Sequence, residues 1–141
     1  MVDWNAIADD VCALLRTRMP LETVNRTEDA MERRKPATLP SVLWVRGKTD
    51  FKDNGNGSVD IDVQWHAIIR AKTMENTDGC EACATVVARA LHGYRPVVSF
   101  SALRLETDEY LQDENNHAPS RILTFRQEAR DVQGEYLLCR S

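Results

Sequence analysis

An alternating segment, Val59 to Ala71, is the feature that most limits how this chain can fold. Its odd-numbered positions are apolar through Ile69, and polar residues occupy most of the places between, namely Asp60, Asp62, Gln64, His66 and Arg70. This period of two predicts a β-strand with one buried face. Thirteen residues at about 3.3 Å each span roughly 43 Å, so we expect the strand to extend beyond its own core.

Two Asn-Gly dipeptides precede this strand, at positions 54–57. Both residue types tolerate positive φ, which favours a hairpin turn. Segment 41–46 (Ser-Val-Leu-Trp-Val-Arg) is apolar on both faces, as expected of a strand inside a sheet. We therefore predict a long hairpin over about 41–71. Its turn should be mobile in the isolated subunit, because consecutive glycines without apolar anchors leave little to hold it.

A first helix is predicted from Asp3, a favourable capping residue, to about Arg18, and Pro20 ends it. Its apolar stripe consists of Trp4, Ile7, Ala8, Val11, Cys12 and Leu15. A short strand at 21–25 and a charged loop with one helical turn at most, up to Pro40, are expected to follow.

A second helix is predicted to end near His92, with Gly93 closing it. Asp78 and Glu81 have the spacing of a capping box at its start. Its apolar stripe consists of Cys80, Cys83, Val86, Val87, Ala90 and Leu91. Two further strands, near 101–107 and 121–132, are separated by a polar loop at 113–119.

These elements predict an α+β fold in the order α-β-β-β-α-β-β, with a mostly antiparallel sheet and both helices on one face. We expect residues 1–141 to form a single domain, with 133–141 as a flexible tail or edge segment. The predicted core or near-core residues are Trp4, Ile7, Val11, Leu15, Val42, Trp44, Ile61, Val63, Val86, Val87, Leu91 and Phe125.

Composition excludes several classes of protein. The net charge of −4 argues against a domain whose main task is to grip phosphate backbones, although a local basic face remains open. No apolar run is long enough to span a membrane, and the N-terminus has no secretory pattern. Four unevenly placed cysteines fit a reducing cytoplasm better than a disulfide scaffold.

Cys80 and Cys83 form a CxxC motif at the predicted start of a helix, where the helix dipole can stabilise a thiolate. A small thiol-disulfide oxidoreductase is therefore an alternative function. Both sulfurs nevertheless fall on the apolar stripe of the helix, where cysteine behaves as a small hydrophobe. We favour core packing for both side chains.

Other motifs for chemistry are weaker. A zinc site needs four ligands, and no second pair stands at ligand spacing. Segment 50–57 resembles a calcium loop, but Lys52 falls where a carboxylate belongs in both registers tried. No nucleophile elbow, HExxH helix or phosphate-binding glycine loop occurs in the sequence. We predict a protein that is not an enzyme and has no cofactor or metal.

The polar face of the long strand is the candidate surface for oligomers or partners. The residues proposed for it are Asp60, Asp62, Gln64, His66 and Arg70, together with Arg33, Arg34 and Lys35 of the charged loop. Asp60 and Asp62 could also act as paired carboxylates, although alternating charge on a solvated face is commoner. The basic triplet could touch nucleic acid, but acidic neighbours make a solvated loop the better interpretation.

The overall pattern resembles Mu-like phage tail proteins of the tail-terminator, or tail-completion, kind. The likeness covers roughly residues 4–132. It rests on the Leu-Pro-Ser-Val stretch at 39–42, the Leu-His-Gly step at 91–93, the Leu-Arg-Leu-Glu stretch at 103–106 and the Leu-Thr-Phe-Arg stretch at 123–126. These are patterns of packing and turns and not catalytic signatures. The CxxC motif and the basic triplet are not family features, and the resemblance gives them no role.

Such proteins are similar to the lambda-type terminator, an α+β fold that forms a hexameric ring on the finished tail tube. The resemblance implies a ring that caps the tube, stops its polymerisation and presents a surface for the head. The implied partners are copies of the chain itself, the tail tube protein and a head–tail connector protein, with no membrane and no sequence-specific nucleic acid. The implied location is the head-proximal end of the virion tail, after assembly in the bacterial host cytoplasm. A non-catalytic adaptor with the same fold is a further alternative.

Overall fold

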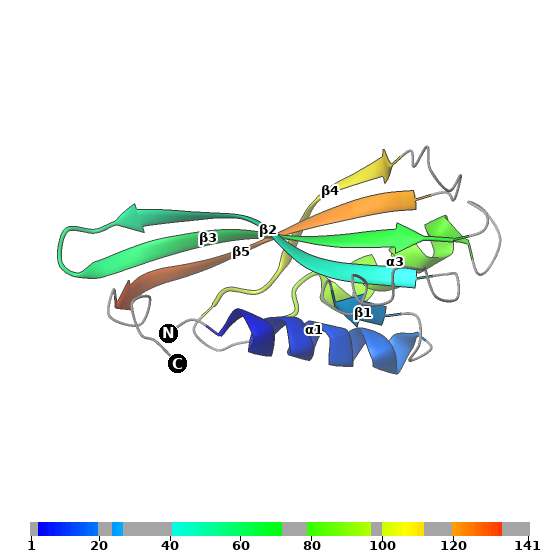
Figure 1. Cartoon of the computed structure of the whole chain (residues 1–141), viewed down its shortest axis with the longest axis horizontal. Coiled ribbons are helices and arrows are strands. Elements are labelled where there is room, and N and C mark those ends of the chain that lie inside the picture. The colour runs from blue at the N-terminus through cyan, green and yellow to red at the C-terminus, as the bar shows by residue number, and fades with distance from the viewer. Residues whose placement is uncertain are drawn as a thin grey trace.

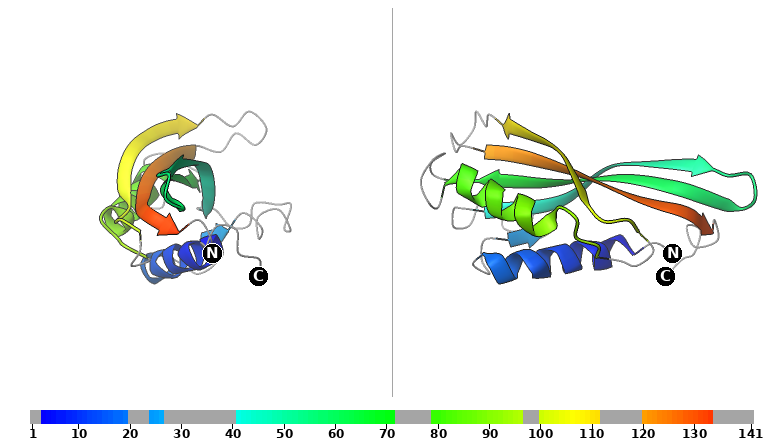
Figure 2. Two further views of the ribbon diagram at one scale, coloured as in Figure 1. Left: turned by 90° about the vertical axis from the view of Figure 1, so that its left-hand side faces the viewer. Right: turned by 180° about the vertical axis from the view of Figure 1, so that it is seen from behind.

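The computed structural model describes residues 3–19, 24–26, 41–71, 79–96, 100–111 and 120–133. Within these ranges the chain forms two helices and one five-stranded sheet, whose strand order is β1-β2-β3-β5-β4. The β1–β2 pair is parallel and the other three pairs are antiparallel. Both helices lie on one face of the strongly twisted sheet (Figures 1 and 2). The predicted fold class and element order are confirmed.

Helix α1 spans Trp4–Arg18, as the sequence predicts. The carboxylate of Asp3 accepts a hydrogen bond from the backbone N–H of Ala6 at 3.0 Å, which satisfies a donor that the first helical turn leaves without a partner. The buried side of the helix consists of Ile7, Ala8, Val11, Cys12 and Leu15. Trp4 is half-buried and packs against the edge of this core.

Helix α3 spans Cys80–Leu91, and its start differs from the prediction. Gly79, and not Asp78, is the N-cap, and a glycine has no side chain to cap the helix, so the predicted N-cap at Asp78 is wrong. Asp78 itself lies outside the described residues. At the other end His92 is the C-cap, and Gly93 has the positive φ of 85° that lets the chain leave the helix.

The buried side of α3 is also rotated from the predicted stripe. It consists of Cys80, Cys83, Ala84, Val87 and Leu91, and Val86 and Ala90 are only half-buried. The predicted stripe left out Ala84, which is buried, and included Val86, which is half-buried. Val86, which was predicted as core or near-core, is half-buried and lies outside the buried core.

Strands β2 (Ser41–Asp53) and β3 (Ser58–Arg70) form an antiparallel hairpin. β2 is seven residues longer than the predicted strand at 41–46, because its polar second half pairs with β3 although its side chains are mostly exposed. Positive φ values of 80° and 85° at Gly55 and Gly57 form the predicted turn.

The remaining strands lie on either side of this hairpin. β1 (Val24–Arg26) pairs with residues 42–44 and lies partly within the predicted strand at 21–25. β4 (Arg104–Leu111) begins and ends later than predicted, and β5 (Ser120–Gln133) closely matches its prediction. The charged loop, the polar loop at 113–119 and the tail after Gln133 lie outside the described residues.

The core lies between the sheet and the two helices. Trp44 and Trp65 stack there with ring centroids 5.4 Å apart, and Phe125 lies 5.8 Å from Trp44. Apart from Trp4 and Val86, every residue predicted for the core is buried. None of the described helices has the length and apolarity needed to cross a membrane.

One end of the sheet projects past both helices (Figure 1). We call this part the arm and define it as residues 47–53 of β2, the turn 54–57, residues 58–64 of β3 and residues 127–133 of β5. β3 is its central strand. On β2 the outer residues Asp50–Asp53 are exposed, including the aromatic side chain of Phe51, which is 53% exposed.

Candidate assembly surface

The structure places the polar residues of β3 on the face of the sheet opposite the helices. Asp60, Asp62, Gln64 and His66 are only partly exposed, and the residues that alternate with them from Ile61 to Ile69 are buried. Arg70 ends the same series and pairs in register with Ser41 and Ser120. The predicted basic partners Arg33, Arg34 and Lys35 lie outside the described residues.

Asp62 faces an arginine of the neighbouring strand instead of solvent. Its Oδ1 atom lies 3.0 Å from Nε of Arg126, an ion-pair distance, although the geometry falls short of a directional hydrogen bond. Nη1 of Arg126 also lies 3.4 Å from the carboxylate of Glu106. One arginine thus links the carboxylates of two strands across β5.

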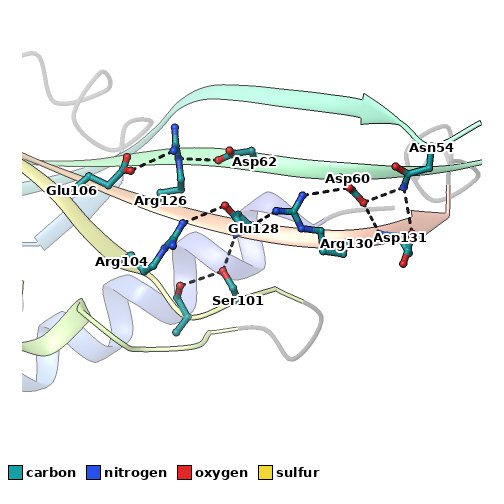
Figure 3. Close-up of polar contacts among 11 residues, drawn as sticks. Asn54, Asp60, Asp62, Ser101, Arg104, Glu106, Arg126, Glu128, Arg130 and Asp131 are labelled. Atoms are coloured by element: carbon teal, nitrogen blue, oxygen red, sulfur yellow. Dashed lines mark hydrogen bonds and ion pairs between the residues drawn. The ribbon is translucent and has the colours of Figure 1, made fainter.

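A second series of ion pairs follows the open face toward the tip of the arm (Figure 3). Arg104 donates to Glu128 at 3.2 Å, and Arg130 donates to the same carboxylate at 3.0 Å. Arg130 also lies 3.3 Å from Asp60. Arg104 and Arg130 are more than half exposed, so each of these ion pairs is weak on its own. The Arg104–Glu128 pair joins β4 to β5, and the Arg130–Asp60 pair joins β5 to β3.

Asp60 is the centre of the hydrogen bonds at the tip. It accepts from Nδ2 of Asn54 and from the backbone N–H of Asp131, both at 3.0 Å. The hydrogen bonds from Asn54 and from the Asp131 backbone lower the pKa of its carboxyl, and Arg130 lowers it further. Asp131 has a φ of 55°, unusual for a residue other than glycine, in a β-bulge opposite Asp60.

The hairpin turn is held by polar side chains, which the sequence analysis did not anticipate. Asp53 accepts a hydrogen bond from the backbone N–H of Gly55 at 2.8 Å, and Asn56 accepts from the backbone N–H of Ser58 at 3.1 Å. Asn54 also donates to Asp131 of β5 at 3.3 Å. These contacts tie the turn to the third strand of the arm.

His66 lies where the arm joins the body of the sheet. Its Nδ1 atom is 3.1 Å from the hydroxyl of Thr124, and its ring packs on Gly47 of β2. Burial lowers the pKa of its imidazole, which favours the neutral form. The pairing of β2 with β3 shifts register between Arg46 and Thr49, beside this contact.

The arginines and acids of β4 and β5 are the part of this surface that sequence reasoning missed. Arg126, Glu128 and Arg130 alternate along β5, and this pattern was the available signal. It becomes informative only once β5 is known to pair with β3, which places Glu128 beside Asp62 and the Arg130–Asp131 bulge beside Asp60.

The CxxC cysteines lie in the core and not on this surface. Cys80 is 0% exposed and Cys83 is 6% exposed, which confirms their predicted burial. Burial, then the neighbouring Cys83 and Glu81, raise the pKa of the Cys80 thiol to about 11. A catalytic thiol needs a lowered pKa and access to its substrate. Among the described residues, no three His, Cys, Asp or Glu side chains form a group that could hold a metal ion.

Comparison with solved structures identifies a protein of similar fold. The fold matches a chain in the structure described as the virion of a native gene transfer agent particle, with a TM-score of 0.56. The match covers 89% of this chain and 92% of that chain at 16% sequence identity, and it shows a shared fold. A scan against protein-family models and a search of curated proteins find no match.

Proposed function

We propose that this protein is a structural component of a phage-type particle, a tail terminator that acts by assembly and not by catalysis. Copies of the chain form a closed ring, a hexamer, on the end of the tail tube. The ring ends polymerisation of the tube and offers a joining surface for the head. Its position is the head-proximal end of the virion tail, reached after assembly in the host cytoplasm.

The observation that carries this proposal is the fold shared with a virion chain over nearly the full length of both proteins. The match spans 89% of this chain and 92% of the other, so most of the fold is common to both proteins. The resemblance of the sequence to tail-terminator proteins supplies the finer assignment.

The arm supports assembly on physical grounds. A sheet that projects past its own helices leaves backbone hydrogen-bonding groups of its edge strands open to a partner. A closed ring uses such edges without indefinite aggregation, because every copy offers the same two surfaces and the last copy meets the first. The projecting hairpin, not a pocket, is therefore the functional surface, and the polar face of β3 flanks the contact between copies.

The oxidoreductase alternative lacks this kind of support. The Cys80 sulfur is within 3.5 Å of the backbone carbonyl of Ile69, in the core, and its pKa is raised instead of lowered. An adaptor with the same fold differs from a terminator in only one respect, which is that it does not close into a ring at the end of a tube.

The proposal is tested in the bacterium that carries the gene, by deleting the gene and imaging the particles released. A terminator predicts tails that lack heads and vary in length, because tube growth no longer stops at a fixed point. Complementation with the wild-type gene should restore uniform, head-bearing particles. Particles of normal tail length and normal head attachment in the deletion strain would refute the assignment.

A further inference from the structure

The two edges of the arm are suited to each other. We infer that the β2 edge of one copy pairs in parallel with the end of β5 in the next copy, an inference that rests on the proposed ring. We also infer that this pairing is shifted by two residues toward the arm tip, so that Lys48 meets Glu128 and Asp50 meets Arg130 of the neighbouring copy. The partner is a second copy of this chain.

In the part of the chain that the structure describes, the β2 edge has no partner strand along the arm. β1 covers only residues 42–44 of that edge. Among the residues that the structure describes, no strand pairs with the same side of β2 from Val45 to Asp53. Its exposed side chains include Lys48 and Asp50, which form a weak ion pair at 3.6 Å.

The β5 edge is blocked at Glu128, and beyond Glu128 no described strand pairs with it. Pairing with β4 ends at Arg126, opposite Arg104. Ser101 then forms hydrogen bonds with both backbone groups of Glu128. Its N–H donates to the Glu128 carbonyl at 2.7 Å, and its hydroxyl accepts from the Glu128 N–H at 2.9 Å. Within the described part of the chain, the edge of β5 that remains for a partner is therefore 130–133.

The direction of pairing follows from symmetry. β2 and β5 are both antiparallel to β3, so they run the same way along the arm. In a cyclic ring all arms point in the same direction along the axis. The β2 edge of one copy must therefore run parallel to the β5 edge of the next.

Charge selects the register. Within one copy, Asp50 pairs with Asp62 and Asp62 with Glu128, so Asp50 and Glu128 lie at the same height on the arm. Lys52 is likewise at the height of Arg130, since both flank Asp60. Joining copies without a shift would set acid against acid and base against base.

A shift of two residues reverses this pattern and keeps each side chain on the same face of the sheet. Lys48 then lies beside Glu128, and Asp50 lies beside Arg130. A closed barrel of tilted strands requires such a stagger between neighbours.

The blocked position at Glu128 favours the same register. With the shift, residues 50–52 lie along the open edge at 130–133, because the bulge sets both Arg130 and Asp131 at the height of one residue. Without the shift only Lys52 and Asp53 reach this edge before the turn. The β-bulge between Arg46 and Thr49 bends β2 at the point where the strand must pass Ser101 of the neighbour.

Disulfide trapping tests the register in the full-length chain carrying Cys139→Ser, with the other cysteines buried. One variant combines Asp50→Cys with Arg130→Cys, and its matched control combines Lys52→Cys with Arg130→Cys. Under mild oxidation we expect the first to give covalent multimers larger than a dimer, at about tenfold the yield of the control, because a disulfide needs Cβ atoms about 4 Å apart. Exposed charge pairs are weak, so neither variant should abolish the ring.

The outcomes separate the register from the ring itself. A higher yield from the Lys52 variant, or equal yields, would overturn the two-residue shift. Products that stop at a covalent dimer would indicate two-fold pairing of arms and would overturn the parallel contact. A ring seen by native mass spectrometry with no disulfide in either variant would overturn this inference and leave the proposed function standing. A monomer in the uncrosslinked protein would refute both.

Discussion

The imidazole ring of His66 lies directly against the backbone of Gly47, on the face of the sheet that the helices leave open. A Cβ atom at position 47 would overlap the ring. Thr124 holds the ring in place from β5, so three strands meet at this contact. This close approach requires glycine at position 47, which explains why a glycine occurs within β2.

Replacing Gly47 with alanine should lower the free energy of unfolding by about 1 kcal/mol, because His66 must turn away and lose its hydrogen bond to Thr124. Chemical denaturation measures this change. In a His66→Ala background the same substitution should lower the free energy of unfolding by only a few tenths of a kcal/mol, since the imidazole ring is absent. Equal costs in the two backgrounds would show that the contact does not restrict position 47.

The helix–sheet core should be sensitive to truncation at Leu15 and Val87, which are both 0% exposed. Leu15→Ala or Val87→Ala should lower the free energy of unfolding by about 2–4 kcal/mol, because each leaves a cavity between a helix and the sheet. Ala13, exposed on the opposite side of α1, offers a control position where Ala13→Ser should cost less than about 0.5 kcal/mol.

The sequence predicted the body of this fold well because local patterns determine it. The Asp3 cap, the stripe of α1 and the alternation of β3 are each visible within a short window, and each agrees with the structure. The turn at Gly55 and Gly57 was predictable for the same reason, since positive φ is a local requirement.

The arm was harder to predict because long-range pairing creates it. The second half of β2 has exposed, charged side chains and no apolar face, so only its pairing with β3 makes it a strand. The ion pairs of Asp60 and Asp62 with Arg130 and Arg126 join positions more than sixty residues apart. The predicted start of α3 was misplaced because two neighbouring residues, Asp78 and Gly79, are both suitable as an N-cap, and the structure uses Gly79.

The Cys80 thiol should make the fold sensitive to alkali. Because its pKa is about 11 in the folded chain, against 9.0 ordinarily, the thiol ionises first in the unfolded chain. Its contribution to stability is therefore complete below about pH 9 and is lost as the pH rises toward 11, up to about 2–3 kcal/mol. Between pH 8 and about pH 10.5, the wild type should lose more free energy of unfolding than Cys80→Ala does. A parallel decline in the two proteins would contradict the raised pKa.

The same burial predicts no disulfide reductase activity. Neither Cys80→Ser nor Cys83→Ser should change assembly, and the wild type should not accelerate the reduction of insulin disulfides above a protein-free control. Robust turnover that disappears in either serine variant would revive the oxidoreductase function.

Shortening the hairpin should separate folding from assembly. Deleting residues 52–58 and closing the hairpin with a two-residue turn removes the outer part of the β2 edge, whereas the helices and the Trp44–Trp65 stack remain. We expect a folded protein by circular dichroism that no longer forms rings. Asn54→Ala, which removes the side-chain hydrogen bonds from Asn54 to Asp60 and Asp131 but keeps the strand length, should still assemble. A deletion variant that forms normal rings and completes tails would show that the arm tip has no part in assembly.

Native mass spectrometry of the purified wild-type chain tests the central claim most directly. The account predicts one dominant species with the mass of a closed ring, six copies of the 16.0 kDa chain, and no continuous series of larger assemblies. Moderate salt should shift the amount of this species only modestly, because single exposed charge pairs are weak. A monomer at every protein concentration, or an open-ended series of oligomers, would contradict it.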